Sequence, residues 1–189
     1  MNESLSLGMS AKSILDHLVS GMNVIGQRFE DGEIFLPEVM LAAEAMVSGI
    51  SLLEPALAQQ GLNASKGRVV IGTVEGDIHD IGKNLIGIML KGNGFQVFDL
   101  GKDVPVANYV AKAKEVNADV VGISALMSTT TPGQRKVIEL AKEEGIYGKV
   151  RFIVGGACTT PEWAEKIGAS YATNAAEAVR VIQSLIKEV

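Results

Sequence analysis

From Arg68 onward the chain alternates short apolar runs with longer amphipathic segments, and this alternation constrains the fold more than any other feature. The apolar runs predict strands at residues 68–73, 95–99, 119–124, 150–154 and, more weakly, 170–172. The amphipathic segments predict helices near residues 82–91, 105–116, 133–144, 161–167 and 174–187. Strands that alternate with helices form a parallel sheet with right-handed crossovers. The sequence therefore predicts an α/β fold with a five-stranded parallel sheet.

Residues 11 to about 60 follow a helical period instead. Apolar side chains recur at every third or fourth position on both sides of Asp31-Gly32, which breaks the run. Pro37 suits a first helical turn, and Pro55 marks a boundary. Together these features predict a bundle of about four short helices. We expect this helical domain at residues 1–62 and an α/β domain at residues 67–189, with Gly61 to Gly67 as the linker.

Composition narrows the class of protein. A net charge of −5 without any run of Lys or Arg argues against a nucleic-acid partner. The start of the chain lacks the pattern of a secretory signal, and no apolar run approaches the length that spans a bilayer. The single cysteine, Cys158, has no intramolecular disulfide partner and no activating neighbour in the sequence. We expect a cytoplasmic protein without a membrane partner.

The stretch that follows the first strand carries the chemistry. His79 stands there among carboxylates and glycines, and its imidazole can ligate a metal while Asp77 holds its other nitrogen. Residues 124–130 follow the third strand, and Gly155-Gly156 follows the fourth. In open α/β sheets, ligands bind at the carboxyl edge of the strands. The three loops therefore predict one shared crevice.

The order Asp77-x-His79-x-x-Gly82 resembles the signature of cobalamin-binding domains of the methionine synthase type. The likeness extends to Ser124-x-Leu126 and Gly155-Gly156, and residues 29–37 resemble the helical cap of that family. It covers roughly residues 15 to 185. The likeness is strongest to small stand-alone corrinoid proteins of methyltransferase systems in anaerobes. It implies a flavodoxin-like, Rossmann-like cobalamin domain that follows a four-helix-bundle cap.

The resemblance implies a role for each site residue. His79 would bind the cobalt of cobalamin from the lower face and displace the cofactor's own nucleotide base. Asp77 and Thr130 would form a relay that orients the imidazole. Ser124, Leu126 and the glycine pair would line the channel for the nucleotide tail, with Tyr171 to Asn174 near it. The expected cofactor-binding residues of the α/β domain are Gly76, Asp77, His79, Asp80, Ile81, Gly82, Ser124, Leu126, Thr130, Gly155, Gly156, Ala157 and Tyr171.

Three apolar residues of the helical part receive a role only from the resemblance. Their sequence pattern alone indicates bundle core. The resemblance implies that Phe29, Leu36 and Val39 lie over the upper corrin face and shield a methyl group. An apolar lid of this kind would exclude water and oxidants.

The resemblance also implies a function. The chain would carry a methyl group on cobalamin, which would alternate between methylcobalamin and Co(I) forms, and would catalyse no reaction alone. One partner would be a substrate-specific methyltransferase, and a second would pass the methyl group to tetrahydrofolate or coenzyme M. A separate reductive activase would be needed. The methyl donor, whether methylamine, methanol, a methoxylated aromatic or betaine, would be chosen by the first partner.

Two alternatives within cobalamin chemistry stay open: the cobalamin-binding subunit of a mutase and a cobalamin-dependent sensor. Three other classes fit less well. A receiver domain needs an aspartate where Ser124 stands, and a dinucleotide-binding enzyme needs a Gly-x-Gly-x-x-Gly spacing that the chain lacks. A zinc hydrolase needs more ligands than the scattered His17, His79 and Cys158 supply.

Overall fold

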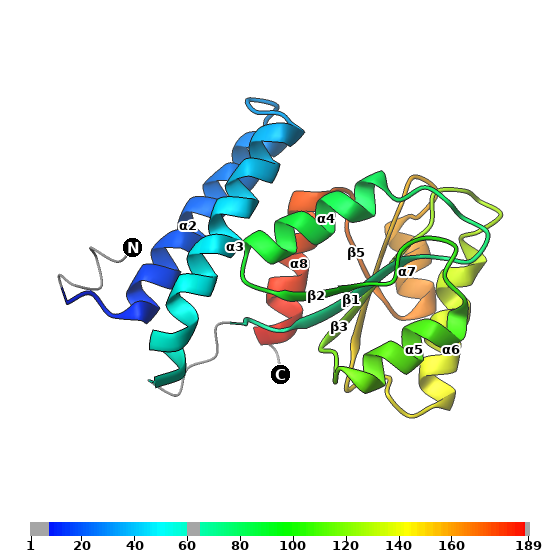
Figure 1. Ribbon diagram of the computed structural model, residues 1–189. Coiled ribbons are helices and arrows are strands. Elements are labelled where there is room, and N and C mark those ends of the chain that lie inside the picture. The colour runs from blue at the N-terminus through cyan, green and yellow to red at the C-terminus, as the bar shows by residue number, and fades with distance from the viewer. Residues whose placement is uncertain (1–7, 60–64, 188–189) are drawn as a thin grey trace. The chain divides into compact units, whose positions relative to one another are not determined.

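The computed structural model describes residues 8–59 and 65–187 (Figure 1). The chain divides into two compact units, of which the first comprises Met1–Lys66 and Ile88–Gln96. The second comprises Gly67–Gly87 and Val97–Val189. The segment Ile88–Gln96 therefore groups with the helical unit, although the sequence assigns it to the α/β domain. The expected domain limits at residues 62 and 67 stay a prediction.

The first unit contains a pair of long helices, α2 (Ala11–Glu30) and α3 (Leu36–Gln59), that pack against each other (Figure 1). Ser10 caps α2, since its hydroxyl accepts a hydrogen bond from the backbone N–H of Ser13 at 3.1 Å. Gly32 follows α2 with a φ of +73°, a conformation that glycine adopts without strain. The buried residues of α3 recur at helical spacing and are Val39, Ala43, Met46, Gly49, Leu53 and Leu57.

The expectation of four short helices is wrong for the described residues, which hold α2 and α3 between residues 11 and 59. Pro55 lies inside α3 rather than at a boundary. A proline removes one backbone hydrogen bond, but α3 buries Leu53 and Leu57 on either side of it. Tertiary packing of this face holds the helix together past the proline. Most of the expected linker, residues 60–64, lies outside the described residues.

Helix α3 also corrects an expectation about membranes. By length and composition alone, Leu36–Gln59 is long and apolar enough to cross a bilayer, whereas the sequence predicts no such run. The prediction overlooked that alanine, serine and glycine separate the larger apolar residues without adding charge. One such helix is weak evidence, because a core helix of a soluble protein passes the same test.

The second unit is built on a five-stranded sheet in the order β2-β1-β3-β4-β5, and each described pairing is parallel (Figure 1). The strands are β1 (Arg68–Thr73), β2 (Gln96–Asp99), β3 (Val120–Ser124), β4 (Arg151–Gly155) and β5 (Ser170–Tyr171). The helices between and after them are α4 (Ile81–Gly92), α5 (Val106–Glu115), α6 (Pro132–Glu143), α7 (Pro161–Ile167) and α8 (Ala175–Lys187). This architecture confirms the predicted fold class.

The register of the central strands decides where the site forms. Thr73 pairs with Ser124, and Ser124 pairs with Gly155, so β1, β3 and β4 end at the same level. Beyond this level the backbone N–H of Val74 still donates to the carbonyl of Ser124 at 3.0 Å. The loops after these three strands consequently leave the sheet side by side.

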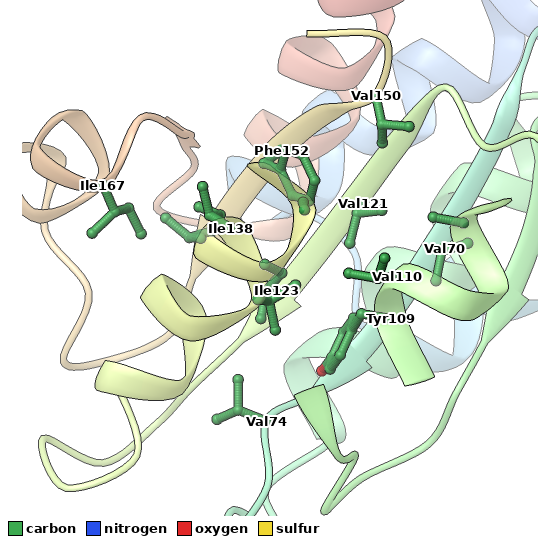
Figure 2. Packing of buried hydrophobic residues seen from close by; sticks show 14 of the residues in the cluster. Val70, Val74, Tyr109, Val110, Val121, Ile123, Ile138, Val150, Phe152 and Ile167 are labelled. Atoms are coloured by element: carbon green, nitrogen blue, oxygen red, sulfur yellow. The ribbon is translucent and has the colours of Figure 1, made fainter. Parts of the chain in front are cut away.

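Alternate strand residues serve the two faces of the sheet. Val70, Val121 and Phe152 belong to a buried cluster that includes Tyr109 of α5 and Ile138 of α6 (Figure 2). The residues in between line a cavity on the opposite face; they include Ile71, Gly122 and Ile153. One face of the sheet is therefore solid core, and the other face leaves space near the carboxyl ends of the strands.

Candidate functional site

Asp77 organises the loop after β1, although it is fully buried. Its Oδ1 accepts hydrogen bonds from the backbone N–H and the ring Nδ1 of His79, at 3.0 and 2.8 Å. Its Oδ2 accepts from the backbone N–H of Leu126 at 2.7 Å and from the hydroxyl of Thr130 at 2.8 Å. A single carboxylate thus joins the loop after β1 to the loop after β3.

These hydrogen bonds decide the charge of Asp77. Burial raises the pKa of the carboxyl group, but the backbone N–H groups of His79 and Leu126 lower it, and the side chains of His79 and Thr130 lower it further. The net pKa of Asp77 lies well below its usual range. Asp77 is therefore an anion at neutral pH, and as an anion it can only accept the hydrogen bond that Nδ1–H of His79 donates.

His79 presents its other nitrogen. With Nδ1 protonated toward Asp77, the lone pair of the imidazole resides on Nε2. The side chain is 48% exposed and borders the cavity. An imidazole held by a carboxylate is an oriented metal ligand of raised basicity. Among the described residues no group of three or more His, Cys, Asp or Glu side chains could hold a metal ion.

The backbone around His79 is fixed from the opposite side as well. Thr73, the fully buried last residue of β1, donates its hydroxyl to the carbonyl of His79 at 3.1 Å. Gly76 turns the chain with a φ of +80°, and its N–H donates to the carboxylate of Asp103 at 2.7 Å. Helix α4 then begins at Ile81, two residues after His79. The imidazole therefore stands on a short loop that is held at both ends.

A cavity of about 710 Å³ opens beside His79 on the α4 and α8 side of the sheet. Of the residues expected at the site, it is lined by His79, Asp80, Ile81, Gly82, Ser124, Leu126, Gly155, Gly156, Ala157 and Tyr171. Gly76, Asp77 and Thr130 do not line it, because Asp77 and Thr130 stand behind the imidazole and Gly76 forms the turn before it. Ala178 and Ile182 of α8 add apolar surface.

Glycine is required where β4 ends. Gly156 has a φ of +126°, and a Cβ atom there would lie 1.9 Å from the carbonyl oxygen of Ala125. The two loops approach each other more closely at this point than any side chain would permit. Gly156 therefore serves the backbone turn and also leaves the cavity wall free of a side chain.

The expected residues of the helical part belong to the first unit and form no part of the cavity lining. Val39 is fully buried, whereas Phe29 and Leu36 are half-buried. Phe35, which the sequence reasoning left out of the site, lies directly before α3 and at 72% is the most exposed large apolar side chain among residues 8–59. Roles for Phe29, Leu36 and Val39 above a cofactor stay a prediction.

The structure adds site residues that the sequence reasoning missed. Ile78 is 65% exposed, and Ile81 on the other side of His79 is 79% exposed, so apolar side chains flank the imidazole. Lys83 is almost fully buried and contacts both carboxylate oxygens of Asp99 at 2.7 Å. Ile78 stands next to His79 in the sequence and could have been named from it. The partner of Lys83 is Asp99 of β2, which is 16 residues further along the chain and leaves no local signal.

Comparisons with known proteins agree with this geometry. The B12 binding domain family matches residues 67–180, and a further B12 binding domain family matches residues 1–54. Dimethylamine corrinoid protein 3 of Methanosarcina mazei is 54% identical over 166 residues, which are 87% of this chain and 99% of that protein.

Two solved structures are similar in fold and sequence. One is the methanol:cobalamin methyltransferase complex of Methanosarcina barkeri, at 31% identity and a TM-score of 0.83, with 100% of this chain and 72% of that chain covered. The other is the monomethylamine corrinoid protein of the same organism, at 39% identity and a TM-score of 0.60, with 97% and 88% covered.

Proposed function

This chain belongs to the B12-binding family of corrinoid proteins, and on that basis we propose that it carries a methyl group, on a bound corrinoid, from one methyltransferase to another. The observation that carries the proposal is the hydrogen bond of 2.8 Å between the Asp77 carboxylate and Nδ1 of His79. This hydrogen bond leaves Nε2 of His79 available beside a cavity. When it is bound, the corrinoid supplies a cobalt ion that accepts and gives up a methyl group.

The residues of the loop after β1 would hold the metal end of the corrinoid. His79 would ligate cobalt through Nε2, while Asp77 keeps the proton on Nδ1 and Thr130 keeps Asp77 in place. Ile78 and Ile81 offer exposed apolar surface on either side of the imidazole. Such surface suits the flat, largely apolar face of a macrocycle.

The cavity would hold the nucleotide tail. Its volume of about 710 Å³ lies in the range of roughly 300–1,000 Å³ typical of small-molecule sites. Its lining is largely apolar, with a few polar groups such as Ser124, Thr173 and Asn174 at its border. We propose that these residues orient the tail while Gly155 and Gly156 let it approach the backbone.

Relatives point to the partners. A relative named dimethylamine corrinoid protein 3 matches this chain over 99% of its own length. We propose that the methyl donor is dimethylamine or a related methylamine, chosen by a separate methyltransferase. An acceptor methyltransferase that uses coenzyme M or tetrahydrofolate and a reductive activase would complete the system, which we place in the cytoplasm.

The helical part would protect the methyl group. We propose that Phe29 and Leu36, both half-buried, contribute apolar surface above the corrin, and that the fully buried Val39 supports them from the helix core. A lid of this kind excludes water and oxidants during the interval between the two transfers. It would have to open for each partner, because methyl transfer requires close, in-line approach.

A labelled-methyl assay tests the proposal. The corrinoid-loaded, reduced chain is mixed with ¹⁴C-dimethylamine and a dimethylamine-specific methyltransferase, and the label bound to the chain is counted. We expect label on the wild-type chain, its discharge to coenzyme M or tetrahydrofolate with an acceptor transferase, and slower labelling of His79→Ala. If no methylamine labels the chain while the adenosyl form binds tightly, the mutase-subunit alternative is favoured. Tight binding with neither labelling nor a mutase partner would favour the sensor.

A further inference from the structure

We propose that Gln134 is a positioning residue that sets the separation between the ends of β3 and β4, and thereby the affinity of the chain for the nucleotide tail of its corrinoid. The inference rests on the proposed function, which places this tail in the cavity beside His79. It concerns a side chain that does not line the cavity and makes none of the contacts described above.

The contacts of Gln134 bridge two strands. Gln134 is fully buried in the first turn of α6, on the solid-core side of the sheet. Its Nε2 donates to the carbonyl of Ile123 in β3 at 3.0 Å and to the carbonyl of Gly155 in β4 at 3.1 Å. Both of these residues line the cavity from the other face. One carboxamide group thus ties together the two strands that form the cavity wall.

The acceptor side of the same carboxamide is also engaged. Oε1 accepts a hydrogen bond from the indole Nε1–H of Trp163 at 3.0 Å and one from the hydroxyl of the buried Thr159 at 3.4 Å. Thr159 and Trp163 belong to the loop after β4 and to α7. Buried polar networks in which every member is paired hold one arrangement strongly. Gln134 therefore fixes the loop after β4 as well as the strand ends.

The side chain of Gln134, which we call the clamp, contacts the sheet at the point where β3 and β4 separate. The last rung between β3 and β4 is the hydrogen bond from the N–H of Ala125 to the carbonyl of Gly155 at 3.1 Å. The carbonyl of Gly155 accepts from Gln134 as well, immediately before Gly156 makes its close approach to Ala125. Beyond this point the described residues show no further strand pairing between the two loops, and Gln134 reaches past the strand end through its contacts with Thr159 and Trp163.

The backbone of Gln134 links the clamp to the metal end of the site. Its N–H donates to the carbonyl of Thr131 at 3.0 Å, and the N–H of Gly133 donates to the carbonyl of Thr130 at 2.8 Å. The turn that carries Thr130 is thereby anchored to the same residue that holds β4. The start of α6 therefore supports two parts of the site. The side chain of Gln134 contacts the cavity wall, and the backbone beside it holds the turn that carries Thr130.

Two corrinoids that differ only in the tail test the inference. Cobalamin carries the nucleotide tail and cobinamide lacks it. In Gln134→Leu, which keeps most of the side-chain volume but loses the hydrogen bonds, we expect the affinity for cobalamin to fall on the order of 10-fold or more. The affinity for cobinamide should stay at the wild-type value. The control Gln96→Leu, at an exposed position of β2, should leave both affinities unchanged.

A gentler variant covers the case in which Gln134→Leu does not fold. Trp163→Phe removes only the indole donor and leaves both bonds to the strand carbonyls, so we expect a smaller loss for cobalamin and none for cobinamide. Because Trp163 is the only tryptophan, its emission in Gln134→Leu also reports directly on the lost contact.

The outcomes separate the inference from the function it rests on. Equal losses for both corrinoids in the variants, or no loss for either, would overturn the role of Gln134 and leave the proposed function intact. If the wild-type chain binds the two corrinoids equally well, both the tail assignment and the clamp are wrong. If it binds neither, the proposed function itself fails.

Discussion

The proposed ligand role of His79 depends on side chains that hold it rather than on the histidine alone. Asp77 fixes the ring through Nδ1, and Thr73 fixes the backbone carbonyl. Because Asp77 is buried and its pKa is lowered by the groups that bond to it, it keeps its charge without a metal. The imidazole is therefore oriented before any cofactor arrives.

Removing either relay group should weaken ligation by His79. We expect Asp77→Asn or Thr130→Ala to cost about 10–100-fold in corrinoid affinity or methyl transfer, because such supporting groups orient a ligand and raise its basicity. The measurement is the pH dependence of the His-ligated absorbance spectrum.

Thr131→Ala is the matched control for this prediction. The hydroxyl of Thr131 donates to the carbonyl of Met127 at 2.9 Å and makes no contact with Asp77. It should leave the spectrum unchanged. If the two relay variants behave like this control, the relay has no role.

Sequence reasoning named the residues that hydrogen-bond to Asp77 through their side chains, His79 and Thr130, while their roles toward a cofactor stay a prediction. Asp77 and His79 stand two residues apart, and the Asp77–His79 and Asp77–Thr130 hydrogen bonds join residues named from the sequence. The choice of Thr130 among neighbouring hydroxyls came from the resemblance alone. Gln134 and Lys83 could not be found, because their partners belong to other helices, strands and loops that are distant in the sequence.

Helix α5 carries an unusual buried group. Tyr109 is fully buried against Gly72 of β1, and its hydroxyl has no hydrogen-bond partner among the described residues. Burial, and then the negative charge of Asp99, raise the pKa of Tyr109 far above its usual range. The hydroxyl thus adds bulk but no bond to the packing of α5 on β1.

Tyr109→Phe should not destabilise the protein. An unpaired buried hydroxyl costs about 1–3 kcal/mol, so its removal should raise the free energy of unfolding by up to this amount. Unfolded tyrosine ionises near pH 10, whereas folded Tyr109 stays neutral, so wild-type stability should fall as pH rises above about 10. That component of the fall should disappear in Tyr109→Phe. Urea unfolding at pH 8 to 11 measures both effects, and a loss of stability at pH 8 would contradict the prediction.

Helix α3 runs past a proline. Pro55 lies in the helix interior, where it leaves the carbonyl of Ser51 without its backbone partner. We expect Pro55→Ala to raise the free energy of unfolding by up to about 3 kcal/mol. Pro37→Ala is the control, since a proline in the first helical turn costs little and its replacement should change stability only slightly. Equal effects at the two positions would show that α3 is not continuous through Pro55.

Helices and strands were predicted unequally well, for physical reasons. The strands of the α/β part agree with the sequence to within one residue at each end, because a parallel strand reads as a compact apolar run. In residues 11–59 the apolar spacing correctly indicates helix. It does not reveal helix length, because the packing of α2 on α3 overrides the breaking tendency of Pro55.

For the chain as a whole, the proposal requires a lid that opens. The sequence predicts at least two dispositions of residues 11–60 relative to residues 68–189, and this stays a prediction. With methylated corrinoid bound, Phe29→Ala should accelerate photolysis of the cobalt–carbon bond. Val24→Ala, at an exposed position of α2, should not. Equal photolysis rates in Phe29→Ala and the wild type would indicate that the helical unit does not shield the methyl group and has only a structural role.

Cobalt ligation by His79 is open to direct measurement. The chain is loaded with cobalamin, reduced to the paramagnetic Co(II) form, and its electron paramagnetic resonance spectrum is recorded with natural and nitrogen-15-labelled histidine. We predict a nitrogen splitting that changes with the label in the wild type and in His17→Ala, whereas any splitting in His79→Ala should not change with the label, since it would come from the nucleotide base. A wild-type splitting that does not change with the histidine label, or a label-dependent splitting in His79→Ala, would contradict ligation by His79 and with it this account of the site.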